Sequence, residues 1–144
     1  MITVRQLLAR KGYGIRHIDP EASVFEALQV MAEWDVGALV VLRGGELVGL
    51  VSERDYARKV VLKGRISKDT RVLEIMNDKP SCIASTASVE ECMQLMTNKR
   101  TRHLPVVEND QVSGIISIGD VVKAIIEDRE MTIEELQQYI SGGR

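Results

Sequence analysis

Two serine–aspartate pairs have a spacing that suits a nucleotide site: Ser52 with Asp55, and Ser117 with Asp120. Each pair follows a short apolar run and opens a predicted helix, whose first N–H groups are free and whose dipole favours phosphate. A carboxylate only accepts hydrogen bonds, so it suits two neighbouring ribose hydroxyls. The same spacing also occurs as a plain helix cap. One copy alone would favour the cap, whereas duplication in matching frames argues for ligand contact at Asp120 and leaves the two readings nearly even at Asp55.

Cationic side chains near these pairs could neutralise the phosphates of such a ligand, because arginine presents a planar fork of donors. The candidates are Arg54, Arg58, Lys59, Arg102 and His103. The run 99–103 could instead be a solvated helix end, since cations favour helix C-termini, or a nucleic-acid contact. A net charge of −2 and an aromatic content of 3% argue against a nucleic-acid partner.

The motifs of common enzyme classes are missing from the sequence. It has neither a Gly-x-x-x-x-Gly-Lys phosphate loop nor a Gly-x-Ser-x-Gly nucleophile elbow. Its two histidines are distant from each other, and Cys82 and Cys92 have no metal or redox spacing. We therefore expect no catalytic residue, no metal and no catalytic cofactor. The two unpaired cysteines fit a protein located in a reducing cytoplasm. No run approaches the roughly 18 apolar residues of a membrane span, so no membrane partner is expected.

An internal repeat sets the positions of the two serine–aspartate pairs. A shift of 65 positions aligns residues 18–62 with 83–127 without a gap, and twelve of the 45 pairs are identical. With three extra residues allowed near position 12, the segment 4–8 also aligns with 72–76. A polar joint at 63–69 separates the two copies.

Each repeat is predicted to form a short strand, a helix, two strands and a second helix. The paired strands are predicted at 38–42 and 47–51, and at 104–107 and 112–116. The first helices begin at Ser23 and Ser88, each followed three residues later by glutamate as in a capping box. Gly44-Gly45 and Asn109-Asp110 accept the positive φ of a tight hairpin. The second helices begin at the serine–aspartate pairs, so the repeat places both pairs equivalently.

The second helices are expected to bury an apolar face. These faces are Ala57, Val60 and Val61 in one repeat, and Val122, Ile125 and Ile126 in the other. A last short helix is predicted at 132–140, with its own box at Thr132 and Glu135.

The predicted fold class is α/β. A 45-residue unit is too small to stand alone, so two units are expected to pack face to face around one core, with a pseudo-twofold axis between them. Residues 1–144 then form one module, with the first repeat at 3–62, the second at 71–127 and a helical tail at 128–144.

Four segments give the repeats a family resemblance. In the first repeat they are Val-Gly-Ala-Leu-Val-Val at 36–41 and Gly-Leu-Val-Ser-Glu-Arg-Asp at 49–55. In the second repeat they are Arg-His-Leu-Pro-Val-Val at 102–107 and Gly-Ile-Ile-Ser-Ile-Gly-Asp at 114–120. Each repeat resembles the CBS domain, and the pair resembles a Bateman module of the small single-pair type. The resemblance covers nearly the whole chain. It implies two clefts between the repeats that bind adenosine ligands such as AMP, ADP, ATP, NAD or S-adenosylmethionine.

The resemblance also implies which residues line these clefts. Ribose would be held by Asp55 and Asp120, beside the polar helix-start positions Ser52, Arg54, Ser117 and Gly119. Adenine would be framed by Ile18, Ile83, Gly37, Ala38, Arg102 and His103. Each cleft would take its aspartate from one repeat and its adenine frame from the other. The clefts should differ, because Gly119 replaces a hydroxyl and Gly37-Ala38 offers no charge where Arg102-His103 does.

The expected function is sensing: an adenosine ligand shifts the arrangement of the repeats, and a partner protein or a second copy in a homodimer detects the shift. Asp120 is expected to hold the ribose of the better-occupied cleft, with Arg102 and His103 in its own repeat. The rival hypothesis is a ligand-free module that only oligomerises or docks. The identity of the regulated partner does not follow from the sequence.

Overall fold

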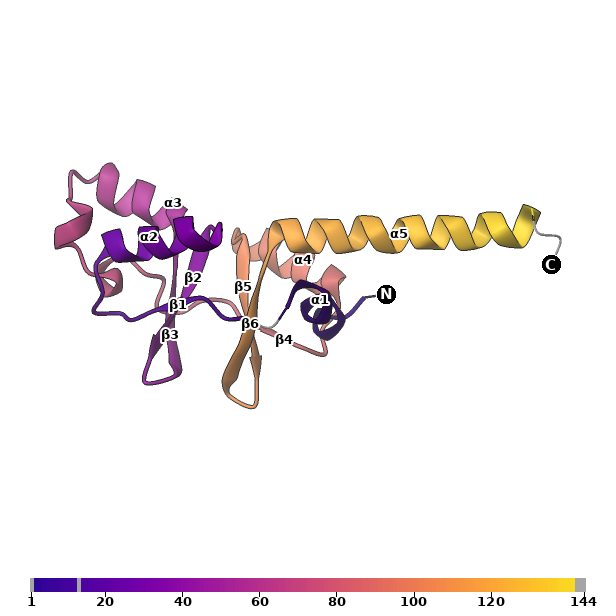
Figure 1. Ribbon diagram of the computed structural model, residues 1–144, viewed down its shortest axis with the longest axis horizontal. Helices are drawn as coiled ribbons and strands as arrows, with labels where there is room; N and C mark the ends of the chain where they lie inside the picture. The colour runs from indigo at the N-terminus through magenta and orange to yellow at the C-terminus, as the bar shows by residue number, and fades with distance from the viewer. Residues whose placement is uncertain (1, 13, 142–144) are drawn as a thin grey trace.

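The computed structural model describes residues 2–12 and 14–141, which form two similar α/β units in a row (Figure 1). The first contains β1 (His17–Ile18), α2 (Val24–Trp34), β2 (Ala38–Arg43), β3 (Glu46–Ser52), α3 (Glu53–Tyr56), the π-helix η1 (Ala57–Val61) and the 3₁₀ helices η2 (Ser67–Asp69) and η3 (Val72–Glu74). The second contains α1 (Val4–Lys11), β4 (Ile83–Ala84), α4 (Val89–Lys99), β5 (His103–Glu108), β6 (Gln111–Ser117) and α5 (Ile118–Ser141).

The two sheets have the same topology and register. β1 pairs in parallel with β2, which pairs antiparallel with β3, and β4, β5 and β6 repeat this order. Ile18 lies opposite Val41, and its counterpart Ile83 lies opposite Val106. Both hairpins turn through two residues of positive φ, Gly44-Gly45 and Asn109-Asp110. The predicted repeat, its strands and its turn residues are therefore confirmed.

The first helix of each repeat begins and ends in the same way. Ser23 accepts a hydrogen bond from the N–H of Glu26 at 3.0 Å, and Ser88 accepts one from the N–H of Glu91 at 3.1 Å. These are the serine halves of the predicted capping boxes. Each helix is followed by a left-handed residue, which stops it and turns the chain into the next strand.

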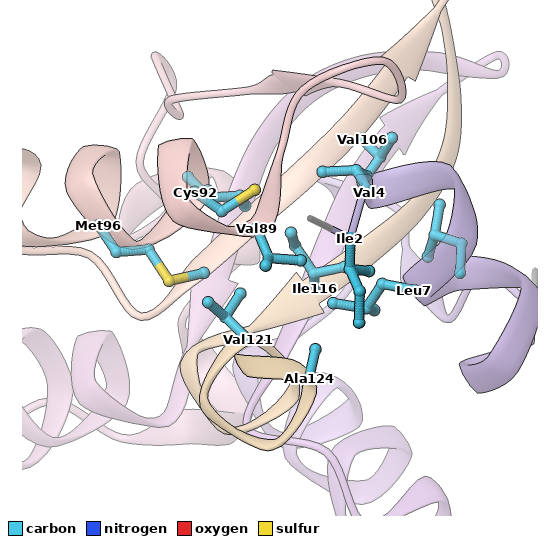
Figure 2. Packing of buried hydrophobic residues seen from close by; sticks show 12 residues of the cluster. Ile2, Val4, Leu7, Val89, Cys92, Met96, Val106, Ile116, Val121 and Ala124 are labelled. Carbon is cyan, nitrogen blue, oxygen red and sulfur yellow. The ribbon is translucent and has the colours of Figure 1, made fainter. Parts of the chain in front are cut away.

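The first segment of each repeat packs against the other unit. The N–H of Val4 donates to Ala87 O at 2.8 Å, and the N–H of Val72 donates to Ala22 O at the same distance. Figure 2 shows Ile2, Val4 and Leu7 packed among residues of the second repeat. The sequence repeat at 3–62 thus differs from the spatial unit, because α1 belongs to the core of the second unit.

Two glycines at equivalent positions make room for these crossing segments. A Cβ on Gly49 would lie 2.6 Å from Met76 Sδ and 3.0 Å from Asn77 O, and a Cβ on Gly114 would lie 2.9 Å from Leu8 Cδ2. Met76 and Leu8 are themselves equivalent under the alignment of 72–76 with 4–8. The identity of these two glycines therefore reflects the close approach of a crossing segment to β3 or β6.

The expectation of one shared core is wrong. Each unit has its own buried cluster: Val24, Ala27, Met31, Leu39, Val51, Val60, Val72 and Ile75 in the first, and Val4, Leu8, Val89, Cys92, Met96, Leu104, Ile116 and Val121 in the second. A third, smaller cluster joins the sheets through Ala38, Val40 and Leu50, with Val112 and Ile115 against it. Two cores form because residues 4–8 complete the core of the second unit and residues 72–76 complete the core of the first.

The second helices differ from their predicted faces. In the first repeat Val60 is buried, but Ala57 and Val61 are exposed, because η1 adds residues to each turn. In the second repeat Val121 and Ala124 are buried, whereas Val122 and Ile126 lie on the outer side of α5. Ile125 is partly buried against the second core.

The predicted C-terminal helix is present, but it continues α5 instead of starting at its own cap. Thr132 donates its hydroxyl to Asp128 O at 3.0 Å inside the helix. Residues 128–131 contain neither glycine nor proline, so nothing stops α5 before the predicted start. Among the described residues, no helix is both long and apolar enough to span a membrane.

Candidate functional site

Two clefts, each of about 330 Å³, lie where the repeats meet. The Asp55 cleft is lined by Gly37, Leu50, Ser52, Glu53, Arg54, Asp55, Asn77, Lys99, Arg100, Thr101, Arg102 and His103. The Asp120 cleft is lined by Lys11, Asp35, Val36, Gly37, Ala38, His103, Ile115, Ser117 and Asp120. Each cleft thus combines the aspartate of one repeat with the 34–38 or 99–103 segment of the other, as the resemblance implied.

Asp55 is held by its own helix start. The N–H and the hydroxyl of Ser52 donate to Asp55 Oδ2 at 2.9 and 3.0 Å, and the N–H of Asp55 donates back to Ser52 Oγ at 3.2 Å. Lys59 Nζ lies 3.2 Å from Asp55 Oδ1 and also donates to Ile75 O. The cap and the cleft position therefore coexist in one residue, so capping alone does not exclude contact with a ligand.

Positive charge dominates the Asp55 cleft. Its lining includes the cations Arg54, Lys99, Arg100 and Arg102 and the carboxylates Glu53 and Asp55. The side chains of Lys99, Arg100 and Arg102 are exposed, so they are accessible to an anion in the cleft. Since these cations outnumber the carboxylates by two, the Asp55 cleft suits a ligand that carries phosphate.

Asp120 has the same cap and, like Asp55, a lysine partner. The N–H of Ser117 donates to Asp120 Oδ2 at 2.8 Å, and Lys11 Nζ lies 2.6 Å from the same oxygen. Lys11 also donates to Ile115 O at 2.8 Å. Burial raises the pKa of the Asp120 carboxyl, but the hydrogen bonds from Lys11 and Ser117 outweigh this and leave the pKa below its ordinary value. Lys11 therefore occupies one acceptor position of Asp120 Oδ2.

The Asp120 cleft has a different charge from its counterpart. Lys11 is its one cation among the described lining residues, against the carboxylates of Asp35 and Asp120. A smaller pocket of about 180 Å³ adjoins it beyond the Lys11–Asp120 pair and adds Arg10 and Lys123. Arg10 already pairs with Glu127 at 3.6 Å. Phosphates in the Asp120 cleft would have to displace or pass Lys11 to reach these cations.

His103 lines both clefts. A Cβ on Gly37 would lie 3.6 Å from its ring, so the two strand starts nearly touch across the junction of the repeats. Burial lowers the pKa of the His103 imidazole below its ordinary value of 6.5, the charges of Lys11 and Arg102 add to this, and Asp120 opposes it. The ring is therefore neutral at pH 7 and separates the clefts without adding charge.

Several predicted site residues lie away from the cleft linings. Ile18 is buried in the first core, Ile83 is partly buried against the second, and Gly119 lies on the exposed first turn of α5. Arg58 is exposed on η1, and Lys59 is engaged with Asp55 and Ile75. Arg102 lies in the repeat of Asp120 but lines the Asp55 cleft, together with the aspartate of the other repeat.

The sequence prediction missed some lining residues. Lys99, Arg100 and Thr101 precede the predicted pair Arg102-His103, and the repeat alignment with 34–36 could have found them. Asn77 and Lys11 had no such signal, because both lie on or beside the segments that cross between units. Within the described residues, no cluster of three His, Cys, Asp or Glu side chains could hold a metal ion.

The fold and the clefts define a tandem-repeat α/β protein with two related clefts between its repeats. The family profile of the CBS domain matches residues 2–62 and 72–127, so the chain belongs to the CBS-domain family, as a tandem pair. The Arabidopsis thaliana protein "CBS domain-containing protein CBSX3, mitochondrial" is 42% identical over 126 residues, which cover 84% of this chain. The aligned region covers 61% of that protein, so the chain spans less than two thirds of its length.

Solved structures agree with this assignment. A protein with CBS domains from Burkholderia ambifaria MC40-6 has a TM-score of 0.84 at 47% identity, covering 88% of this chain and 95% of that one. The CBS domain protein PAE2072 from Pyrobaculum aerophilum, solved in complex with AMP, has a TM-score of 0.74 at 26% identity. That match covers 83% of this chain and 89% of that one. CBS pairs of this fold therefore include a protein that binds an adenine nucleotide.

Proposed function

We propose that this chain is a regulatory CBS pair that binds an adenosine nucleotide, namely AMP, ADP, ATP or NAD, with the phosphates in the Asp55 cleft. The observation that carries the proposal is that Asp55 of one repeat and Arg102 of the other line the same cleft, together with Arg54, Lys99 and Arg100. The AMP complex of the Pyrobaculum aerophilum protein supports the ligand class.

Different lining residues contact different parts of the ligand. Asp55 accepts hydrogen bonds from the ribose hydroxyls, since its carboxylate has lone pairs beyond those used by Ser52 and Lys59. Arg54 and Arg102 contact phosphate from the two repeats. Because the ligand bridges both repeats, its affinity differs between arrangements of the two units, and occupancy shifts the population of those arrangements.

The Asp120 cleft is the weaker nucleotide site in this proposal. The sequence favoured Asp120, on the ground that Arg102 lies in the same repeat. Each aspartate pairs with one lysine, but the Asp120 cleft adds the carboxylate of Asp35, and Arg102 lines the other cleft. Repulsion between these carboxylates and a phosphate opposes binding there.

The chain transmits occupancy to other proteins and catalyses nothing itself. We propose a homodimer and a further regulated protein as the partners that detect the change, with neither nucleic acid nor membrane involved. Cys82 and Cys92 are free thiols, and burial raises the pKa of Cys92 to about 11, which makes it unreactive. The location of the protein in a reducing cytoplasm stays a prediction.

Thermal melting with and without nucleotide separates this proposal from a ligand-free docking module. At a hundred times its dissociation constant, a ligand stabilises the fold by about 2.7 kcal/mol, which raises the melting temperature by roughly 5–11 °C. AMP, ADP, ATP and NAD should each be tried, with adenosine as the phosphate-free control. Absence of any shift would support the docking module.

A matched pair of variants links the shift to the cleft. Arg102→Ala should remove most of the shift, because it deletes a phosphate partner, whereas Lys79→Ala removes an exposed cation outside the cleft lining. Mass spectrometry of any nucleotide that co-purifies with the wild-type protein would then identify the ligand. Product formation above background from ATP or NAD would contradict the absence of catalysis.

A further inference from the structure

His103 forms part of the wall between the two clefts. Among the described residues, Gly37 and His103 are the ones that line both the Asp55 cleft and the Asp120 cleft. His103 begins β5, and a Cβ on Gly37 would lie 3.6 Å from the Cε1 and Nε2 atoms of its ring. The missing side chain at Gly37 thus leaves room for the imidazole where the two repeats meet.

Neither ring nitrogen of His103 has a hydrogen-bond partner among the described residues. Its backbone oxygen accepts a hydrogen bond from the hydroxyl of Thr101 at 3.2 Å, but the ring makes none. In the same part of the chain, no side-chain nitrogen or oxygen is both fully buried and unpartnered, so both ring nitrogens must be accessible to solvent. Because His103 lines the clefts, a ligand there can reach a ring nitrogen.

The surroundings of the ring disfavour its protonated form. Besides the other cations of the Asp55 cleft, the charged groups that face the ring or share its cleft walls are Lys11 on α1, Asp120 on α5, Glu53 on α3, Asp35 before β2 and its chain neighbour Arg102. Burial lowers the pKa of the imidazole most, Lys11 and Arg102 lower it further, and Asp120 opposes them. A histidine in this balance gains a proton when a further negative charge comes close.

A phosphate in the Asp55 cleft would supply that negative charge. In the proposed function Arg102 contacts phosphate from the second repeat, and His103 lines the same cleft. A neutral imidazole donates one hydrogen bond, because its other nitrogen carries a lone pair, whereas an imidazolium donates from both nitrogens. A nearby anion therefore favours the protonated ring, and the pKa of His103 rises when the nucleotide binds.

We propose that His103 takes up a proton from solvent when a phosphate-bearing nucleotide binds in the Asp55 cleft, so that acid strengthens binding. The inference rests on the proposed function and adds its regulation, because occupancy then depends on pH as well as on nucleotide concentration. Since the pKa of the bound state lies above that of the free state, affinity rises as pH falls through the bound-state value and levels off below the free-state value. A pKa increase of about 1 corresponds to a gain in affinity of about tenfold.

Proton NMR titration of the full chain measures this change at the ring itself. The chain has two histidines, His17 and His103, so the histidine signal that remains in His17→Gln belongs to His103. His17 is exposed on β1 and lines neither cleft, so His17→Gln should keep AMP binding. With saturating AMP, the pKa of His103 should be higher by about 1 than without AMP. Equal values with and without bound AMP would overturn the proposal.

Calorimetry at about pH 8 and about pH 5.5 links the proton to affinity. AMP itself titrates in this range, because the second pKa of a phosphate monoester is about 6, so the wild type is compared with His103→Gln, in which this contribution is the same. On acidification the wild type and His17→Gln should gain about tenfold more affinity than His103→Gln.

The two possible failures are distinguishable. AMP binding with an equal gain in the wild type and His103→Gln would overturn the role of His103 and leave the nucleotide site intact. Absence of AMP binding to the wild type at both pH values would overturn the nucleotide site, and this inference with it. Circular dichroism melting shows whether His103→Gln folds, and the NMR titration, which leaves His103 in place, decides the matter if it does not.

Discussion

The two clefts have the same backbone frame and opposite charge. Positions 35 and 100 are equivalent, and both are left-handed residues after a helix, with φ of 51° and 53°. One is Asp35 in the Asp120 cleft, and the other is Arg100 in the Asp55 cleft. Two residues further along, the first repeat has Gly37 and the second has Arg102. The shared positions are those that the backbone requires, while the side chains that line the clefts have diverged.

The divergence extends to the aspartates themselves. Asp55 and Asp120 are both capped by a serine three residues earlier, but their lysine partners come from different places. Lys59 follows Asp55 on the next turn of its own helix, whereas Lys11 reaches Asp120 from α1. A symmetric pair of motifs therefore does not imply a symmetric pair of sites.

The largest expected effect comes from giving the Asp55 cleft the residues of its counterpart. Arg100→Asp/Arg102→Gly removes two phosphate partners, each contributing roughly 1.5–3 kcal/mol as a charged hydrogen bond. AMP affinity measured by calorimetry should fall more than about a hundredfold. The reverse single change, Asp35→Arg, should strengthen binding at the Asp120 cleft by a few fold. Unchanged affinity in the double variant would show that these cations do not contact the ligand.

A smaller effect, on the free energy of unfolding, is expected when Gly49 or Gly114 is replaced. Gly49→Ala and Gly114→Ala should each lower the free energy of unfolding by about 1–3 kcal/mol through overpacking. Gly49→Ala should cost more, because its Cβ would crowd the backbone oxygen of Asn77 as well as Met76, whereas Gly114 faces only the flexible end of Leu8. Urea denaturation measures the difference. A larger loss at Gly114 would contradict this account of the crossing segments.

The smallest effect concerns Lys11. Lys11→Gln should lower the free energy of unfolding at pH 7 by less than about 1 kcal/mol, because the pair with Asp120 is partly exposed and screened by solvent. The folded-state pKa of Asp120 lies below its ordinary value, so the pair stabilises the protein above the unfolded pKa and the effect is lost as pH falls through the folded pKa. The wild type and the variant should therefore converge in acid. A difference that persists below about pH 2 would contradict the electrostatic role.

Much of the fold could be predicted because its determinants are local and duplicated. The hairpins at Gly44-Gly45 and Asn109-Asp110 and the serine caps follow from short motifs that occur twice in register. The crossing of α1 to the second unit could not be predicted, since apolar periodicity does not say which unit a helix packs on. The Thr132 box failed as a start signal because the same residues fit the interior of a helix. Lys11 was missed because it lies on α1, and the sequence does not show that α1 packs on the second unit.

The most direct test of the proposed asymmetry compares Asp55→Asn with Asp120→Asn in titrations with AMP. Asparagine keeps an oxygen that can accept the hydrogen bond from the N–H of Ser52 or Ser117, so each variant removes mainly the carboxylate charge. The account predicts that Asp55→Asn weakens AMP binding about ten- to a hundredfold, and that Asp120→Asn changes it by less than about threefold. A loss confined to Asp120→Asn, or equal losses in both variants, would contradict the assignment of the nucleotide to the Asp55 cleft.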